Sequence, residues 1–339
     1  MKKLHNIYYE KDHRWAVVIR DPERPSYLID TNECLVTSGT HSLLTDPGGM
    51  EIFPAVFSAI STEYNPRNIK MIFASHQDPD IISSLSLWME VNPELKCYLS
   101  WLWTTFVPHF GGNDKTFVAI PDDGMVITLG EIKLKCIPAH YLHSSGNFHL
   151  YDPRAKVYFS GDVGAALLGA DADIYVKNFD EHIKHARGFH ERWMGCNEAR
   201  LDWCQRASEM EIDMMVPQHG SIYQGKDVKR FIDWFSELRV GLFTMAPEQP
   251  KPSDSQTSAV QEEIHQDLSA EVMNEVVVET VQNQDYTEAE DFNKTGQDEP
   301  AMHALMDIHP ESSEEAELLQ KPSRRSLFSA IKSLFTSRK

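Results

Sequence analysis

The chain has 339 residues, of which 41% are hydrophobic, and its 51 acidic residues outnumber 32 basic ones for a net charge of −19. This length and apolar content suffice for a sizeable buried core. The first 246 residues contain no concentrated basic patch, which argues against nucleic acid as a partner. The five cysteines are widely spaced without a Cys-x-x-Cys pair, which argues against a disulfide framework or an iron–sulfur cluster.

A polar, charged stretch follows Met1-Lys2-Lys3, where a secretory signal would have an apolar core. No apolar run reaches the length of a bilayer span. Together with the unpaired cysteines, this pattern favours a cytoplasmic protein.

Residues 1–246 alternate β-branched runs, Gly/Pro/Asp turns and helical stretches, which predicts a mixed α/β domain. We expect helices at 53–62, 80–91, 180–194, 197–210 and 228–243. The third and fourth of these are expected to form a helical hairpin that closes over the functional site.

The most informative segment is 72–81, in which an apolar run that predicts a buried strand ends at His76 and is followed by Asp78 and Asp80. A strand that delivers His-x-Asp-x-Asp into a turn places one imidazole and two carboxylates around one point. Because like carboxylates repel each other, such a cluster is costly without a cation. The plainer alternative is a polar turn in which an aspartate caps the next helix.

Three later strand-like runs also end in potential metal ligands. They bring His140 and His143, then Asp162 after a glycine, then His219 before a glycine. Loops at strand ends combine a rigid support with an accessible site. Each of these residues alone would more often be a capping or core residue, but four such strand ends together predict a metal site.

The sequence resembles the metallo-β-lactamase fold in the order of four motifs: His76-x-Asp78-x-Asp80, His143, Ser160-Gly161-Asp162 and Gln218-His219-Gly220. This resemblance implies an αββα sandwich, in which two facing sheets are flanked by helices and metals lie at one rim. Hydrolases of this fold typically have a histidine at the position of Asp78. A carboxylate there is similar to the di-iron branch, the flavodiiron and oxygen-binding di-iron proteins. The segment His143-Ser144-Ser145-Gly146-Asn147-Phe148 is similar to the oxygen-binding group in particular.

The resemblance implies that the first iron takes four side chains, His76, Asp78, His143 and the bridging Asp162. The second iron takes Asp80, Asp162 and His219. Flavodiiron proteins often have a further histidine directly after the last aspartate of the first motif, where this chain has Ile81. The implied second site therefore has only three protein ligands and is completed by water or a diatomic ligand.

The donor set favours iron on chemical grounds as well. Three imidazoles and three carboxylates without a thiolate suit iron, with manganese and zinc as less favoured metals. A bridging carboxylate holds two cations close together, and two ferrous ions can each give one electron to bound oxygen. Zinc has no redox chemistry and would indicate hydrolysis instead.

Two further residues are candidates for a supporting role. Asp46 ends an early strand where this fold carries an aspartate, which would orient a ligand histidine through a hydrogen bond. The alternative for Asp46 is simple turn chemistry in an Asp-Pro-Gly-Gly segment. His140 is expected either to donate a hydrogen bond near the site or to line a pocket wall. His109 and His149, like the histidines in the helix at 180–194, are not expected to be ligands.

The composition changes after Ala246. Residues 247–320 contain 19 acidic and 2 basic residues, which predicts a disordered acidic linker. Residues 321–339 contain 6 basic and no acidic residues. They predict an amphipathic helix whose apolar stripe consists of Leu327, Phe328, Ile331, Leu334 and Phe335. Such a helix fits the anionic inner face of a membrane, with a partner's groove and docking onto its own domain as alternatives.

Flavodiiron enzymes draw electrons from a fused flavodoxin domain, and nothing after Met245 resembles a flavin-binding domain. The sequence therefore predicts a non-haem di-iron protein that binds O2 or NO as a sensor or as a slow reductase with an external electron donor. A signalling partner is expected for a sensor. The alternative is a metal-dependent hydrolase of esters or phosphodiesters, against which Asp78 and Ile81 count. In a third interpretation the metal is structural and the tail is the active part.

Overall fold

The computed structural model describes residues 3–18, 28–110, 115–169 and 171–242. The predicted acidic linker at 247–320 and the predicted amphipathic helix at 321–339, with its stripe from Leu327 to Phe335, lie outside the described residues. None of the helices in the described ranges combines the length and apolarity needed to cross a membrane.

Two β-sheets face each other. The strands of the first sheet lie side by side in chain order: β1 (Leu4–Glu10), β2 (His13–Val18), β3 (Glu33–Ser38), β4 (His41–Thr45), β5 (Met71–Phe73), β6 (Lys96–Ser100) and β7 (Phe117–Ile120). The pairs from β1 to β4 are antiparallel, whereas those from β4 to β7 are parallel. The carboxyl ends of β4 and β5 therefore point toward the same edge.

The second sheet has the order β13-β12-β11-β10-β9-β8. Its strands are β8 (Met125–Leu129), β9 (Ile132–Pro138), β10 (Phe148–Asp152), β11 (Val157–Phe159), β12 (Met214–Val216) and β13 (Tyr223–Gln224). Only the β11–β12 pair is parallel, so that the segments that follow these two strands leave the sheet at the same edge.

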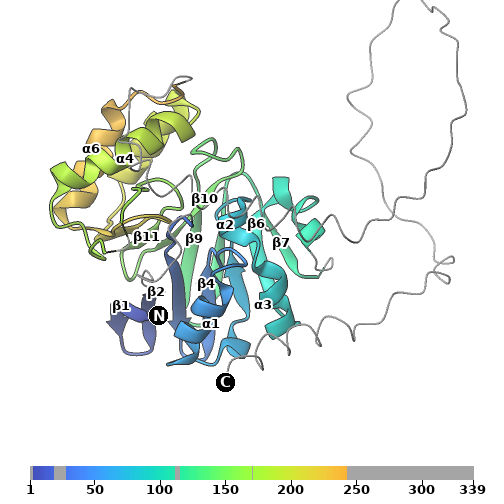
Figure 1. Ribbon diagram of the computed structural model, residues 1–339. Helices are drawn as coiled ribbons and strands as arrows, with labels where there is room; N and C mark the ends of the chain where they lie inside the picture. The colour runs from blue at the N-terminus through green and yellow to red at the C-terminus, as the bar shows by residue number, and fades with distance from the viewer. Residues whose placement is uncertain (1–2, 19–27, 111–114, 170, 243–339) are drawn as a thin grey trace, which may run out of the picture. The chain divides into compact units, whose positions relative to one another are not determined.

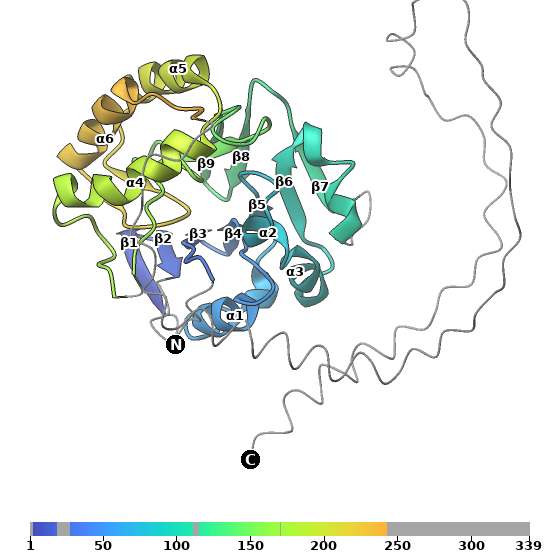
Figure 2. The ribbon, with the colours of Figure 1, turned by 45° about the horizontal axis from the view of Figure 1, so that its top comes forward.

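Helices cover the outer faces of both sheets. Those of the first sheet are α1 (Phe53–Ser61), α2 (Pro79–Ile82) and α3 (Leu85–Val91), and those of the second are α4 (Phe179–Trp193), α5 (Asn197–Ser208) and α6 (Lys226–Glu237). Figures 1 and 2 show the two groups on opposite sides of the sheets. Short 3-10 helices occur at Pro66–Asn68, Trp101–Trp103 and Val107–Phe110. The expected αββα sandwich is confirmed.

Three hydrophobic clusters hold the four layers together. Phe73 and Phe159 meet between the sheets with ring centroids 6.5 Å apart. Trp88 of α3 lies in the cluster beneath the first sheet, and Trp203 of α5 lies in the cluster above the second. Because successive side chains of a strand point to opposite faces, Leu150 packs between the sheets while its neighbour Tyr151 packs toward the helices.

Two predicted helices differ from the observed ones. The helix expected at 80–91 is broken into α2 and α3, since Ser83 accepts a hydrogen bond from the Met50 amide and Ser84 donates one to the Pro47 carbonyl. The helix expected at 228–243 ends at Glu237. There Arg200 of α5 donates to the carbonyls of Phe235 and Ser236.

The hairpin expected from the predicted helices at 180–194 and 197–210, which are α4 and α5, is wrong. Helix α5 packs mainly against α6 rather than against α4. The Asn197 side chain fixes this arrangement by donating to the Val240 carbonyl and accepting from the Val240 amide, each at 3.1 Å. The physical reason is the apolar face of α6, whose Phe231 and Phe235 pack against Trp203 of α5.

A buried polar contact joins the two sheets at the end of the sandwich opposite to the carboxyl end of β5. The Asp152 carboxylate at the end of β10 lies 2.7 Å from His13 Nε2 and accepts a hydrogen bond from Trp15 Nε1, also at 2.7 Å. His13 and Trp15 belong to β2 of the other sheet and are 0% exposed. Because a buried carboxylate needs such partners, the contact helps to fix how the sheets face each other.

We expect Asp152→Ala to lower the free energy of unfolding by about 3–5 kcal/mol, because it leaves buried polar partners unpaired. Denaturant unfolding followed by circular dichroism measures this change. Glu10→Ala is the matched control, since it removes an exposed acid whose partner is Arg154. An Asp152→Ala protein as stable as the wild type would contradict the assigned role.

Candidate metal centre

Six side chains from four segments meet at one edge of the sandwich. They are His76, Asp78, Asp80, His143, Asp162 and His219, and we call them the acid–imidazole cluster. The first three follow β5 of the first sheet, and the others follow β9, β11 and β12 of the second. The Gln218 amide donates to the Gly161 carbonyl at 2.6 Å, which extends the β11–β12 pairing and sets Asp162 beside His219.

Glycines permit the backbone paths that present two of these side chains. Gly161 has φ +50° and Gly220 has φ +95°, both in the region that favours glycine. A Cβ atom on Gly220 would lie 2.9 Å from the Ala166 carbonyl oxygen. The glycines next to Asp162 and His219 are thus required by the fold of the two loops.

One half of the cluster contains two imidazoles and two carboxylates. Oδ2 of Asp162 lies 2.8 Å from His143 Nε2 and 3.5 Å from His76 Nε2. Oδ2 of Asp78 lies 3.4 Å from His143 Nε2 and 3.7 Å from His76 Nε2. The donor atoms of His76, Asp78 and His143 all lie within 4.8 Å of one another, which is the spacing of groups that could hold a metal ion.

The other half shares Asp162. His219 Nε2 lies 3.4 Å from Oδ1 of Asp162 and 3.3 Å from Oδ2 of Asp80. The two oxygens of Asp162 therefore face two different groups of donors, as a carboxylate that bridges two metals must. The side chains of Asp78 and Asp80 are 31% and 34% exposed, whereas that of Asp162 is 4% exposed, so the cluster opens to solvent on the side of the first two.

Asp78 occupies the N-cap position of α2, but its carboxylate makes no capping hydrogen bond. The plainer sequence interpretation, an aspartate that serves only as a helix cap, therefore does not describe this side chain. Ile81, at the position where flavodiiron proteins often carry a histidine, is 0% exposed and packs in the cluster beneath the first sheet.

Hydrogen bonds fix two of the imidazole rings through their far nitrogens. The Ser75 hydroxyl donates to Asp46 Oδ2 at 2.7 Å and accepts from His76 Nδ1 at 2.9 Å, and the Ser75 amide donates to Asp46 Oδ1. His219 Nδ1 donates to the Asp30 carbonyl oxygen at 2.6 Å. Both rings thus turn Nε2 toward the cluster, and this nitrogen can bind a metal once it has lost its proton.

Several contacts of the cluster were not predicted from the sequence. Gln77 bridges Asp78 and Ser144, with hydrogen bonds of 3.1 Å and 2.7 Å. Phe189 of α4 lies edge-on to His219, with ring centroids 6.3 Å apart. Of these residues, only Gln77 could have been singled out from the sequence, because it lies inside the first motif.

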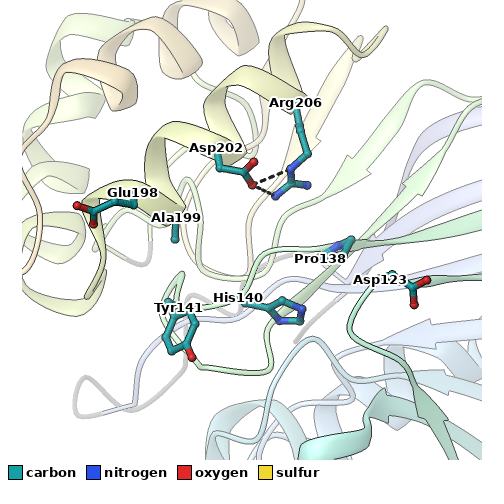
Figure 3. Close-up of a pocket in the computed structure, with 8 residues that line it drawn as sticks. All are labelled: Asp123, Pro138, His140, Tyr141, Glu198, Ala199, Asp202 and Arg206. Carbon is teal, nitrogen blue, oxygen red and sulfur yellow. Dashed lines mark hydrogen bonds and ion pairs between the residues drawn. The ribbon is translucent and has the colours of Figure 1, made fainter.

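His140 lies apart from the cluster. Its Nε2 is 2.9 Å from the Asp122 carbonyl oxygen, and its ring lines a groove of about 560 Å³ between its own loop and α5. Figure 3 shows His140 and Tyr141 on one side of this groove and the Asp202–Arg206 ion pair of α5 on the other. No hydrogen bond joins His140 to the six clustered side chains in the described part of the chain.

Two further histidines, His149 of β10 and His190 of α4, are buried in the core. His149 is 0% exposed, and its Nδ1 lies 3.0 Å from the Tyr158 hydroxyl and 3.1 Å from Trp203 Nε1. His190 accepts a hydrogen bond from the Gly164 amide. Neither contacts the cluster directly. Burial lowers the pKa of His149 well below its usual value and that of His190 to about 4, which keeps both rings neutral.

The donor set passes a simple test for a metal. Three buried atoms of the cluster form no hydrogen bond of acceptable geometry: His76 Nε2 and His143 Nε2 in the first half, and Asp162 Oδ1, which faces the second half. Buried polar atoms in native proteins normally have a partner, and orphaned ones need an explanation. A cation bound in each half would supply the missing partners, and imidazole and carboxylate together suit iron, manganese or zinc.

The pKa values of the clustered side chains also indicate a site suited to a cation. Burial lowers the pKa of each imidazole, but the neighbouring carboxylates, Asp162 foremost, outweigh it. The pKa of His219 is raised to about 10, that of His143 to about 9, and that of His76 well above its usual value. In turn the imidazoles hold the pKa of Asp162 far below its usual range despite burial. Without metal, protons on the imidazoles thus balance the carboxylates.

We expect the metal-free chain to lose stability as the pH rises from about 7 to 10. The pKa values of folded His143 and His219, about 9 and 10, exceed that of an unfolded histidine, about 6.5. Their contribution is therefore complete below that lower value and is lost as the pH passes through the folded values. Denaturant unfolding at a series of pH values measures the slope.

The same protons compete with metal. The apparent affinity for a divalent ion should rise over this pH range, because fewer protons have to be displaced. Asp162→Asn serves as the comparison, since it removes the charge that raises both pKa values and should flatten the stability slope. An equal slope in the two proteins would contradict the electrostatic assignment.

The sandwich and the acid–imidazole cluster at its rim define a metallo-β-lactamase-fold protein of the di-iron branch. The model of a family described as ODP family beta lactamase matches residues 29–220, and the chain belongs to this family. No match was found among curated proteins.

Solved structures agree with this membership. The apo state of the chemotaxis sensor ODP from T. denticola is 36% identical, with a TM-score of 0.64, and the match covers 71% of this chain and 96% of that one. A structure described as the peroxy diiron species of chemotaxis sensor ODP is 35% identical, with a TM-score of 0.64, covering 70% of this chain and 96% of that one. A mutant flavo di-iron protein from Thermotoga maritima shares the fold at 20% identity and a TM-score of 0.61, with 70% of this chain and 61% of that one covered.

Proposed function

We propose that this protein is a non-haem di-iron protein that binds O2 or NO, acting as a sensor or as a slow reductase supplied by an external donor. The observation that carries the proposal is the Asp162 carboxylate, whose two oxygens face two separate groups of donors. Family membership supports it, because the relatives of 35% and 36% identity are described as a chemotaxis sensor, one of them as a diiron species.

The proposed first iron is held by His76, Asp78, His143 and Asp162, and the proposed second iron by Asp80, Asp162 and His219. Imidazole and carboxylate donors without thiolate favour iron over structural zinc, and manganese is the nearer competitor. Because Ile81 packs in the core, the proposed second position has three protein donors and would be completed by water or a small exogenous ligand.

A pair of ferrous ions, when bound, would supply the electrons by which oxygen is bound or reduced. The chain's own residues do the rest. Ser75 and the Asp30 carbonyl hold His76 and His219 with Nε2 toward the cluster. The partly exposed Asp78 and Asp80 mark the side from which a diatomic molecule can enter. Buried side chains around Asp162 keep bulk water from the bridging oxygens.

A sensor needs a signalling partner, whereas a reductase needs an electron donor. The more similar relatives are described as a chemotaxis sensor, which favours the first role for this chain. We therefore propose that reversible ligand binding, read by a partner protein, is the main activity.

We expect anaerobically purified protein to contain about two iron ions per chain, as a two-metal site requires. Exposure to air should produce a new visible absorption band. Asp162→Ala should lose both the band and most of the iron, because it removes a donor from each half of the cluster. Asp123→Ala, an exposed acid away from the cluster, is the matched control.

Elemental analysis and absorption spectroscopy decide the outcome. Full iron content and an unchanged band in Asp162→Ala would refute the assignment. Stoichiometric zinc, together with cleavage of a generic phosphodiester, would instead support the hydrolase alternative.

We further propose peripheral membrane contact through residues 321–339, on sequence grounds alone. The segment is basic and has an apolar stripe, which fits an anionic surface. Deleting residues 321–339 should abolish cosedimentation with phosphatidylserine vesicles. Unchanged cosedimentation would refute this contact, and binding of the full chain to a partner protein but not to vesicles would favour the partner's groove.

A further inference from the structure

We propose that Gln77 and Ser144 form a positioning clasp that fixes Asp78 in a one-oxygen mode toward the first metal position and makes that position the tighter of the two. Neither residue is a ligand in the proposed function, on which this inference rests for the identity of the metal site. Both lie beside proposed ligands, in two loops that come from different sheets.

The clasp is a directed chain of hydrogen bonds. The Gly146 amide donates to Ser144 Oγ at 3.3 Å, and the Ser144 hydroxyl donates to Gln77 Oε1 at 2.7 Å. Gln77 Nε2 then donates to Asp78 Oδ1 at 3.1 Å. All three hydrogen bonds run in the same direction, from Gly146 toward Asp78. The Gln77 amide orientation is set by this order, because Asp78 can only accept when ionised.

Asp78 contacts both the Gln77 amide and two imidazoles. Its Oδ1 lies 3.1 Å from Gln77 Nε2, and its Oδ2 lies 3.4 Å from His143 Nε2. The two oxygens therefore face different partners, and the Gln77 amide takes one of them.

This division of oxygens has a direct consequence for binding. With Oδ1 engaged by Gln77, only Oδ2 faces His76 and His143, at 3.7 Å and 3.4 Å. A carboxylate held in this way would offer one oxygen to a metal. A carboxylate released from the clasp could rotate and would offer both.

The clasp also spans the gap between the sheets at the rim. Gln77 follows β5 of the first sheet, whereas Ser144 lies in the loop between β9 and β10 of the second. Ser144 further accepts from the Tyr141 and Asn147 amides through its carbonyl oxygen, at 2.7 Å and 3.2 Å. It thus anchors the loop that carries His143 and ties that loop to Asp78.

The second position has less support of this kind. Asp80 makes an ion pair with His219 at 3.3 Å, and in the described part of the chain no side-chain amide or hydroxyl donates to its carboxylate. Residues that hold a ligand in place typically change metal affinity by about 10–100-fold when removed. The clasp therefore gives the first position the higher affinity and sets the order in which the two metals load.

The test is titration of the metal-free full chain with Co²⁺ alone, followed by visible absorption and by the infrared carboxylate stretches. The wild type should show two binding steps of unequal affinity. Gln77→Met, which keeps the length of the side chain but removes both hydrogen bonds, should weaken the first step by about 10-fold or more and leave the second nearly unchanged. Ser144→Ala should do the same, because it releases Gln77.

Two variants separate positioning from a general loss of structure. Ser144→Thr keeps the hydroxyl and should restore most of the first-step affinity. Ser145→Ala alters the neighbouring serine, which takes no part in the clasp, and should bind Co²⁺ as the wild type does. In Gln77→Met the splitting between the asymmetric and symmetric carboxylate stretches should narrow, as expected when a carboxylate binds through two oxygens.

The outcomes are distinct. Equal first-step affinities and equal carboxylate splittings in wild type, Gln77→Met and Ser144→Ala would overturn the clasp while leaving the metal site intact. A parallel weakening of both steps, or failure of Ser144→Thr to restore affinity, would likewise overturn it. A wild type that binds no Co²⁺ would instead refute the metal site, and with it the proposed function.

Discussion

The structure depends on one carboxylate that stands between two groups of imidazoles. Asp162 is almost fully buried, and its charge is tolerable only because His76, His143 and His219 lie within 3.5 Å of its oxygens. A buried charge without such partners would cost several kcal/mol. The contacts that compensate the buried charge of Asp162 also orient its two oxygens toward the two halves of the cluster. The same three imidazoles therefore determine both the electrostatics and the geometry of this residue.

The sandwich makes these contacts possible because loops from both sheets meet at a common rim. Apolar packing between the sheets fixes their distance but has little directionality. Polar contacts add directed interactions at both ends of the sandwich. At one end Asp152 contacts His13 and Trp15, and at the other Gln77 contacts Ser144. The positions of the clustered side chains at the rim can thus be well defined, even though the loops that carry them are irregular.

Much of this could be predicted from the sequence, because the informative signals are local. The four strand ends carry their polar residues within a few positions of an apolar run, and the first helix begins at the predicted Phe53. What could not be predicted depends on contacts between distant segments. The break at Ser83 and Ser84 follows from hydrogen bonds to the loop at 47–50, and the early end of α6 follows from Arg200. The partnership of Gln77 with Ser144 joins residues 67 positions apart, which no local pattern reveals.

The placement of Ile81 has a consequence for how this kind of centre can diverge. Its side chain fills core space beneath the first sheet, so replacing it with a histidine would create a cavity or bury an imidazole among apolar groups. Either change costs about 1–5 kcal/mol. Gaining a seventh donor thus requires compensating repacking around α2, not a single codon change. The three-donor arrangement proposed for the second position is thus maintained by the hydrophobic interior, because a histidine at this place would lower stability before it could add a donor.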